Sequence, residues 1–278
     1  MQSYKPHHTL VPYIECYWSW RVEPLSPELD PILPDAAPEF IVHLGKVPRI
    51  LKEEGNWQQQ PQSYLYCAAH RSVRLIVEGS INMFAVRFRP WGVARFSDGS
   101  MADFIDREVL PDEAFGNLGL TLHEKIAMAN DDEGRVIAAN TVLGGALHRH
   151  RERSERLEQL GILVNGGQSK GSDIAKSLCM SERSFRRLWH DAVGIEQRKF
   201  ASLMRFHRAV SLIDAGCQLA DVAQECGYSD QPHLARDIKS ISGLQPSLLR
   251  KRLGADVYQS LYVHRPAAPW HPGSKDQW

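Results

Sequence analysis

The 278-residue sequence lacks any close pair of cysteines and any long apolar run. Because its five cysteines stand singly, it has neither a disulfide framework nor a CxxC motif for zinc or redox chemistry. These residues are Cys16, Cys67, Cys179, Cys217 and Cys226. No window reaches the roughly 18 apolar residues of a membrane span, and the N-terminal residues show no secretory signal pattern. We therefore expect a cytoplasmic protein without a membrane partner.

The sequence also lacks the motifs of common catalytic sites, including GxSxG, Walker A, GxGxxG and HExxH. The tightest histidine pair, His148 and His150, would point in two directions on a helix, which makes a poor metal site. We expect no enzymatic activity, no cofactor and no metal. One alternative stays open, in which the chain is a small-molecule-binding enzyme or an alkyl sensor using Cys16 or Cys67. In that case its C-terminal helices would serve only assembly.

Charge of one sign is not in excess, because 33 Lys and Arg residues balance 33 Asp and Glu residues. The distribution along the chain is nevertheless uneven. Residues 1–150 carry 14 basic against 19 acidic side chains, and residues 151–254 carry 17 against 12. Such asymmetry suggests that the basic half meets a polyanion, although uneven surface decoration would give the same counts.

The hydrophobic pattern changes near residue 117. Before it, segments 13–22, 39–47, 72–80 and 81–92 are rich in aromatic and β-branched residues, which favours strands. After it, apolar residues recur every three or four positions, as in helices. The charged run at 148–158 is typical of a solvated helical linker. We expect an α+β protein with a β-rich, barrel-like domain at 1–115, a helical connector at 116–153, an all-α domain at 154–254 and a flexible tail at 255–278.

The basic half contains an internal repeat of about 48 residues, which occurs twice. The segment "SDIAKSLCMSERSFRRLW" (172–189) aligns with "ADVAQECGYSDQPHLARDI" (220–238), whose turn is one residue longer. Each copy has the pattern of a helix-turn-helix, with a small alanine where two helices cross and a small residue in the turn. Two tandem helix-turn-helix units are therefore predicted.

The second helix of each copy is predicted to begin at a capping side chain. Ser181 can cap the first, and Ser229 or Asp230 the second. Pro232 then falls in the first helical turn, where its missing N–H costs nothing. The outward faces of both helices are rich in Arg, Gln, His and Lys, which read base edges or neutralise phosphates. A solvated face is the simpler interpretation of either helix alone, but the pair favours DNA binding.

These motifs resemble the DNA-binding domain of the AraC/XylS family of bacterial transcription regulators. The resemblance covers about residues 154–254 through "IAKSLCMSERSFRRLWHDAVG", "FASLMRFHRAVSLIDAG" and "LADVAQECGYSDQPHLARDIKSISGLQPSLLRK". It implies a sequence-specific DNA-binding transcription regulator whose recognition helices, at 181–192 and 230–242, enter successive major-groove segments. A linker helix at roughly 198–215 joins the two units and carries Arg205, where the family has a near-constant arginine.

The resemblance also implies eight DNA-binding residues by position. The expected base readers are Arg183, Arg186 and Arg187 in the first helix, and Gln231, His233 and Arg236 in the second. His190 and Lys239 are expected to contact phosphates.

The chain departs from the family pattern in two places. After Gly194 it has Glu196 and Gln197 instead of the usual serine and proline. Its last recognition helix has Leu234 and Ile238 where aromatic residues are usual. The second departure suits a core, and the first leaves open how the exit from the first unit is braced.

The N-terminal half resembles, through "ILPDAAPEFIVHLG" and "FRPWGVARF", a less-studied N-terminal type in the same family. The resemblance implies promoter DNA and RNA polymerase as partners, and leaves open a small-molecule effector, a homodimer, and activation or repression. The polar candidate residues of this half could instead be exposed residues of loops and edge strands without a function. The aromatic residues of 13–20 could likewise be core residues instead of ligand contacts. The candidate effector-binding residues are Asp35, Glu39, His43, Arg87 and Arg89.

Overall fold

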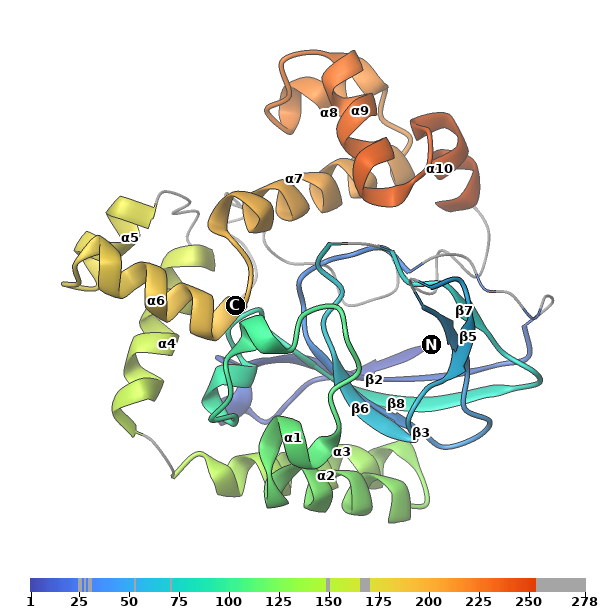
Figure 1. Ribbon diagram of the computed structural model, residues 1–278, viewed down its shortest axis with the longest axis vertical. Helices are drawn as coiled ribbons and strands as arrows, with labels where there is room; N and C mark the ends of the chain where they lie inside the picture. The colour runs from blue at the N-terminus through green and yellow to red at the C-terminus, as the bar shows by residue number, and fades with distance from the viewer. Residues whose placement is uncertain are drawn as a thin grey trace.

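Two antiparallel sheets form the N-terminal half of the computed structural model (Figure 1). The structure describes residues 1–253 except 25, 26, 28, 30, 31, 53, 71, 149, 150 and 166–170, so the expected tail at 255–278 lies outside the described residues. The larger sheet has the strand order β1 (Gln2–Tyr4), β2 (Ile14–Val22), β8 (Ile81–Phe88), β3 (Glu39–His43), β6 (Ser63–Tyr66). The smaller sheet has the order β5 (Trp57–Gln59), β4 (Arg49–Leu51), β7 (Leu75–Ile76).

Side-chain alternation on β2 gives the larger sheet two buried faces. Neighbouring residues on a strand point to opposite sides. Tyr17 lies in the main core, where its ring stacks on Phe84 with 6.1 Å between centroids. Trp18 and Trp20 belong instead to a second cluster, which includes Ile50 of the smaller sheet. The second cluster therefore fills the space between the two sheets.

Helices cover the other face of the larger sheet. They are α1 (Pro111–Phe115), α2 (Asn117–Met128) and α3 (Asp132–Ala146), which Figure 1 shows as one layer against the strands. Leu122 of α2 and Leu143 of α3 are fully buried in the main core. The helices expected as a connector thus form part of the N-terminal half.

Asp132 fastens α3 to the sheet edge. Its carboxylate accepts hydrogen bonds from Ser19 Oγ at 2.7 Å, Arg21 Nη2 at 2.6 Å and Arg135 Nη1 at 2.7 Å. Burial alone would raise the pKa of Asp132, but these hydrogen bonds lower it below its usual range. The N-terminus of α3 is therefore held by a buried polar cluster.

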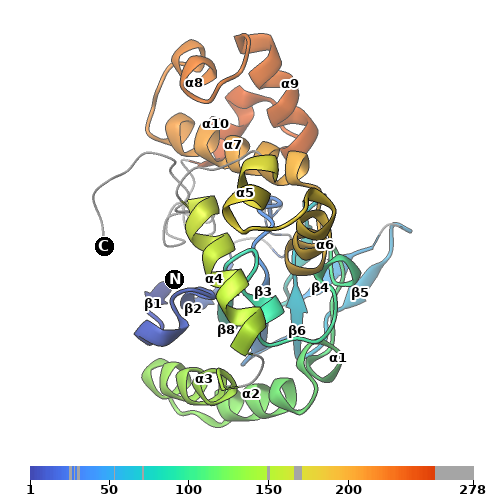
Figure 2. The ribbon, with the colours of Figure 1, turned by 90° about the vertical axis from the view of Figure 1, so that its left-hand side faces the viewer.

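Helix α4 (Arg151–Asn165) packs on the N-terminal half, and in Figure 2 it lies in front of the strands. Leu157, Leu160 and Val164 form one buried stripe, and Tyr13 Oη donates to Glu158 at 2.5 Å. Within 148–158 the described charged side chains are exposed, as expected for a solvated helical run, but Leu157 is buried, so the run is packed on the N-terminal half on one side. The charged run hides the first leucine of an apolar stripe that continues beyond it.

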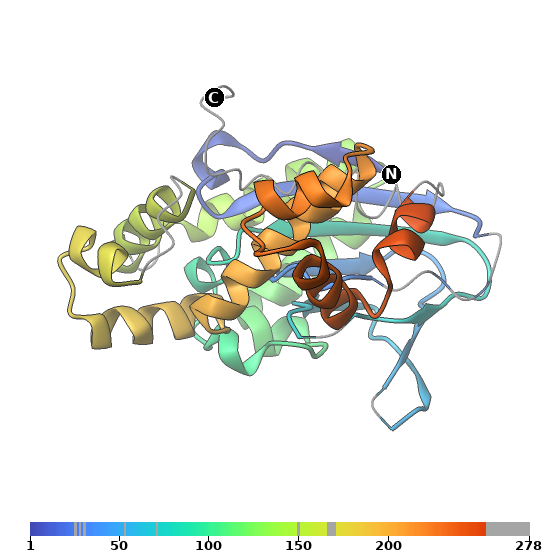
Figure 3. The same ribbon diagram turned by 90° about the horizontal axis from the view of Figure 1, so that it is seen from above.

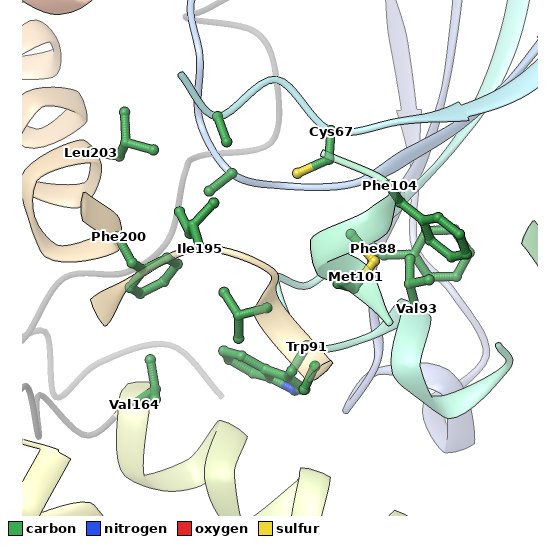
Figure 4. Close-up of a cluster of buried hydrophobic side chains, with 14 of the residues drawn as sticks. Cys67, Phe88, Trp91, Val93, Met101, Phe104, Val164, Ile195, Phe200 and Leu203 are labelled. Carbon is green, nitrogen blue, oxygen red and sulfur yellow. The ribbon is translucent and has the colours of Figure 1, made fainter. Parts of the chain in front are cut away.

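One continuous core joins the two halves of the chain (Figure 4). Trp91 and Met101 contribute from the N-terminal half, while Ile195 and Phe200 contribute from the C-terminal half. A Cβ atom on Gly161 of α4 would lie 2.7 Å from the Trp91 ring, so the two surfaces meet at van der Waals distance. The first C-terminal helices are thus packed directly on the β-rich half.

The C-terminal half is entirely helical in its described part, as expected, and the α+β class is confirmed. In Figure 3 its later helices lie above the strands. Its helices are α5 (Gly171–Ser177), α6 (Glu182–Val193), α7 (Gln197–Asp214), α8 (Leu219–Glu225), α9 (Gln231–Ser242) and α10 (Pro246–Leu253). Among the described residues no helix is long and apolar enough to cross a membrane.

Candidate nucleic-acid interface and a buried cavity

Helices α5 and α6 form the first helix-turn-helix, called unit 1 (residues 171–194). The N–H of Met180 bonds to the Ala175 carbonyl at 2.9 Å and closes the turn. Cys179 takes a left-handed conformation there, with φ of 53°. Ser181 Oγ accepts a hydrogen bond from the N–H of Ser184 at 3.2 Å, which confirms it as the cap of α6.

Helices α8 and α9 form unit 2 (residues 219–243) with the same backbone pattern. The N–H of Tyr228 bonds to the carbonyl five residues earlier at 2.8 Å, and Gly227 is the left-handed turn residue with φ of 72°. Of the two capping candidates, Asp230 serves, since its Oδ1 accepts from the His233 N–H at 2.6 Å. Pro232 lies in the first turn, as predicted.

Both recognition helices end at a left-handed glycine. Gly194 has φ of 82° and Gly243 has φ of 73°, conformations that L side chains rarely adopt. Phe185 of α6 and Leu234 of α9 are fully buried. The aliphatic residues of unit 2 are therefore core residues, as expected.

Arg205 of α7 braces unit 2 against the linker helix. Its guanidinium lies 4.7 Å from the centroid of the Tyr228 ring and 3.7 Å from Asp237 Oδ2. Tyr228 Oη donates to the same carboxylate at 2.8 Å. One arginine thus ties α7 to both the turn and the second helix of unit 2.

The outward faces of α6 and α9 carry seven of the eight predicted DNA-binding residues in exposed positions. They are Arg183, Arg186, Arg187, His190, Gln231, Arg236 and Lys239. The side chain of Arg187 is 87% exposed, and its Nε lies 3.9 Å from Asp191, which is too long to hold it firmly. Long basic side chains of this kind can reach bases and phosphates.

The eighth predicted residue, His233, is half-buried and engaged locally. Its ring stands at 89° to that of Tyr228, with 5.2 Å between centroids. Its Nδ1 lies 3.1 Å from Ser229 Oγ. The structure therefore places His233 at the turn of unit 2 as well as beside the outward face.

The C-terminal end of α6 rests on the short helix η3 (Met101–Asp103) of the N-terminal half. A Cβ atom on Gly194 would lie 2.7 Å from the carbonyl of Met101. Ser100 Oγ also donates to Asp191 Oδ1 at 3.4 Å. Unit 1 is thereby held against the β-rich half, and Asp191 at this contact lies 3.9 Å from Arg187 and 3.6 Å from His190 of the outward face.

A cavity lies between the two sheets, lined by residues of β2, β3, β6 and β8 and by the loops beside them. Its volume is about 60 Å³, counted for the centres of water-sized molecules. Four aromatic side chains and four polar side chains line it. They are Trp18, Trp20, Tyr64 and Tyr66, and Asp35, Glu39, His43 and Gln60.

The structure brings three of the five predicted effector residues to this cavity, namely Asp35, Glu39 and His43. Arg87 and Arg89 are not among the lining residues. Arg89 Nε donates instead to the Val11 carbonyl at 2.7 Å. None of the five is solvent decoration, because the first four are buried and Arg89 is half-buried.

Arg87 is the centre of a buried ionic cluster behind the cavity wall. Its nitrogens bond to Asp35 Oδ2 at 2.7 Å, Glu39 Oε1 at 2.8 Å and Glu15 Oε2 at 3.1 Å. Burial alone would lower the pKa of Arg87, but the three carboxylates raise it well above its usual value. Burial raises the pKa of Glu15. One cation is therefore shared by three acidic groups.

The His43 side chain has neither a hydrogen-bond partner nor a charge at neutral pH. Both ring nitrogens are buried without a partner, and so is Oε1 of Gln60. Burial lowers the pKa of His43 to about 4. Trp18 and Trp20, on the aromatic strand 13–20 for which core packing was expected, also line the cavity, whereas no pattern in the sequence pointed to Gln60, because only strand pairing brings it there.

The cysteines of the alternative chemical-sensor hypothesis are poor nucleophiles. Burial raises the pKa of Cys16 to about 12, and it raises the pKa of Cys67 well above its usual value. Reactive cysteines need a lowered pKa and access to solvent. No group of three metal-ligating side chains occurs within the described residues.

Two family models match the chain. A model described as a domain of unknown function (DUF6597) matches residues 2–110, and a model described as a helix-turn-helix domain matches residues 174–252. None of the curated proteins matches the chain.

Among solved structures, the chain is similar to ToxT from Vibrio cholerae. One such structure has 11% sequence identity and a TM-score of 0.47, with 86% of this chain and 98% of that chain covered. ToxT bound to (E)-4-(8-methylnaphthalen-1-yl)but-3-enoic acid has 11% identity and a TM-score of 0.46, with 85% and 98% covered.

Proposed function

We propose that this chain, whose helix-turn-helix domain is of the AraC type, inserts helices α6 and α9 into successive major-groove segments of promoter DNA. The domain makes the chain a DNA-binding transcription regulator. The observation that carries the finer proposal is the pair of matched units with exposed basic faces, joined by α7. That helix has 18 residues, a length of ~27 Å against ~34 Å for one turn of DNA.

The exposed side chains divide into two roles by chemistry. Arg183, Arg186 and Arg236 are suited to guanine, because a guanidinium can bond O6 and N7 together. Gln231 is suited to adenine in the same way. Lys239, like His190 when it is protonated, carries a point charge suited to phosphate, which strengthens binding to every sequence equally.

The cavity of the N-terminal half is proposed as an effector site. Enclosed, mostly apolar spaces with a few converging polar groups are the usual form of small-molecule sites. Leu33 and Asp35 line the cavity, and the carbonyl of Pro34 between them accepts a hydrogen bond from His207 Nε2 at 2.8 Å. Because His207 lies on α7, a ligand that moves segment 33–35 would act on the linker between the two units.

The test of DNA reading is a fluorescence-anisotropy titration of the full chain against DNA from its own upstream region, at several salt concentrations. The full chain is needed because α4 and unit 1 share a core with the N-terminal half. We expect tight binding with a steep salt dependence and a preference over scrambled DNA. The double variant Arg186→Ala plus Arg236→Ala should lose about 2–6 kcal/mol of binding free energy if both read bases.

The matched control is Arg49→Ala plus Arg107→Ala, which removes the same charge from the N-terminal half. Each of these arginines is ion-paired there, to Glu78 and Glu113. The control should bind operator DNA like the wild type. If the Arg186→Ala plus Arg236→Ala variant binds operator DNA as tightly as the wild type, α6 and α9 are not the recognition helices.

A further inference from the structure

Two lining side chains with unpartnered polar atoms lie together at one end of the cavity. Both ring nitrogens of His43 and Oε1 of Gln60 are buried without a hydrogen-bond partner. Tyr64 links the two residues, since its ring centroid lies 5.8 Å from that of His43 and its hydroxyl shares a hydrogen bond with Gln60. Strand pairing places Met83 opposite His43, and Trp20 opposite Met83. We call His43, Gln60 and Tyr64 the neutral end of the cavity.

The carboxylates that line the cavity lie at its other end and are already engaged. Glu39 and His43 are the first and last residues of β3, which places them about 13 Å apart along the strand. Asp35 lies beside Glu39, because both bond to Arg87, at 2.7 and 2.8 Å. Asp35 Oδ1 also accepts from the Ala37 N–H at 3.0 Å, and both carboxylates make further interactions. Neither therefore requires a cationic ligand.

A charged ligand is disfavoured at the neutral end. No lysine or arginine is among the described residues that line the cavity, so an anion would meet no counter-charge, and the carboxylates at the other end would repel it. A cation would leave water for a mostly apolar space in which both acidic groups are already bonded. An uncharged ligand avoids both costs.

The neutral end offers both a donor and acceptors. Because burial lowers the pKa of His43 to about 4, its imidazole is neutral at pH 7 and presents one N–H donor and one accepting nitrogen. Oε1 of Gln60 adds a second acceptor. Buried polar atoms that lack a partner cost free energy, so the matching ligand group is one that donates and accepts at the same time.

The rest of the wall is suited to an apolar body. Trp18, Trp20, Ile41 and Met83 line the cavity between its two ends or opposite them. A volume of about 60 Å³, counted for the centres of water-sized molecules, corresponds to roughly four to six waters. That space is close to the size of one six-membered ring.

We propose that this cavity binds a compact uncharged molecule of about one ring, whose hydroxyl or carboxamide group donates to and accepts from His43 and Gln60. This inference rests on the proposed function of the cavity as a small-molecule site. The polar group of the ligand lies at the neutral end, and its ring lies against the apolar wall. Asp35 and Glu39 keep their bonds to Arg87 and exclude anions.

The experiment is a calorimetric titration of the full chain with four molecules that share one ring: benzyl alcohol, toluene, benzylamine and benzoate. All are used at neutral pH and one ionic strength. We expect the alcohol to bind more tightly than the ammonium or the carboxylate by about tenfold or more, because only the ions lose the hydration of a full charge. Toluene, which lacks the polar group, should bind more weakly than the alcohol.

The other outcomes separate the ligand class from the site itself. Tighter binding of benzylamine or of benzoate would overturn the uncharged class while supporting a small-molecule site. Toluene binding as tightly as the alcohol would overturn the role of the neutral end. Absence of saturable binding by all four molecules, with operator binding intact, would overturn both the ligand class and the sensing role of the cavity but not DNA reading.

Two variants locate the binding. Gln60→Leu and His43→Leu each remove polar atoms at similar volume, and each should weaken binding of the alcohol by roughly two- to tenfold without weakening that of toluene. His8→Leu, at an exposed position of the same half, should leave both affinities unchanged. Gln60→Leu serves if His43→Leu fails to fold. Unchanged affinity for the alcohol in a folded variant, or an equal loss for toluene, would overturn the proposed contacts.

Discussion

Units 1 and 2 share a backbone plan but are anchored to different parts of the molecule. The turn hydrogen bonds, the capped second helix and the left-handed terminal glycine occur in both. Unit 1 rests on η3 of the N-terminal half through Gly194. Unit 2 is braced to α7 by Arg205 and Tyr228. The repeat in the sequence thus specifies the scaffold of each unit, while side chains that differ between the two copies, such as Tyr228, and their partners outside the repeat decide what each unit is attached to.

The largest expected effect separates the two terminal glycines. Gly194→Ala and Gly243→Ala both force alanine into a left-handed conformation, which costs roughly 1–2 kcal/mol. At position 194 the new Cβ would also lie 2.7 Å from the backbone carbonyl of Met101. At position 243 no atom lies within 4 Å of the new Cβ. We expect Gly194→Ala to lower the melting temperature clearly more than Gly243→Ala. Thermal denaturation of both full-length variants measures this, and equal shifts would show that the contact with η3 carries no stability.

The next effect concerns the brace of unit 2. Arg205→Met keeps the aliphatic stem but removes the cation above Tyr228 and beside Asp237, at an expected cost of about 1–2 kcal/mol. Hydrogen exchange should become faster in α9 and stay unchanged in α6. Arg208→Met on the same helix is the control, because its ion pair with Glu225 is long, at 3.9 Å, and Glu225 is exposed. Faster exchange in both units, or in neither, would contradict a brace confined to unit 2.

The third effect is at the turns. Cys179 has φ of 53°, where unit 2 has Gly227 with φ of 72°. Cys179→Gly should relieve the strain and raise stability by about 0.5–1 kcal/mol, after the entropy that glycine loses on folding. Gly227→Ala should lower stability by a similar amount, since no atom lies within 4 Å of the added Cβ and only the conformation is unfavourable. Changes of the same sign in the two variants, measured by urea denaturation, would refute a shared turn geometry.

Much of this scaffold could be predicted from the sequence because its signals are local. A cap, a proline in the first turn and apolar residues four apart are all read within one or two helical turns. They predicted that the second helices begin after Ser181 and after Ser229 or Asp230, and the structure has α6 at Glu182–Val193 and α9 at Gln231–Ser242. The cysteine in a left-handed turn was also foreseeable, by alignment with glycine in the second copy.

The N-terminal half could be predicted less fully, because long-range pairing decides it. Strands β2, β3 and β8 match predicted segments, but β4, β5 and β6 have only three or four residues, too few to show a period. The cavity needs two sheets to face each other, so Gln60 could not be assigned to it. Gly144 and Gly145 have low helix propensity, yet α3 continues through both to Ala146. Packing of its other residues on the sheet outweighs their low helix propensity.

The smallest expected effect is at the N-terminus of α7, where the chain departs from the pattern of the family that it resembles. Glu196 is the N-cap residue of α7 and makes no side-chain capping bond, whereas Ser181 and Asp230 both cap their helices. Glu196→Ser should therefore raise stability by about 0.5 kcal/mol through a new bond to a free N–H. The same substitution removes a carboxylate near the positive, N-terminal end of the helix, which offsets part of the gain. Urea denaturation measures the net change in stability. Ser181→Ala is the opposite control and should lower stability by about 1 kcal/mol. If Glu196→Ser leaves stability unchanged or lowers it, the carboxylate already stabilises the start of α7 through the helix dipole, and the exit from unit 1 is braced by charge instead of by a cap.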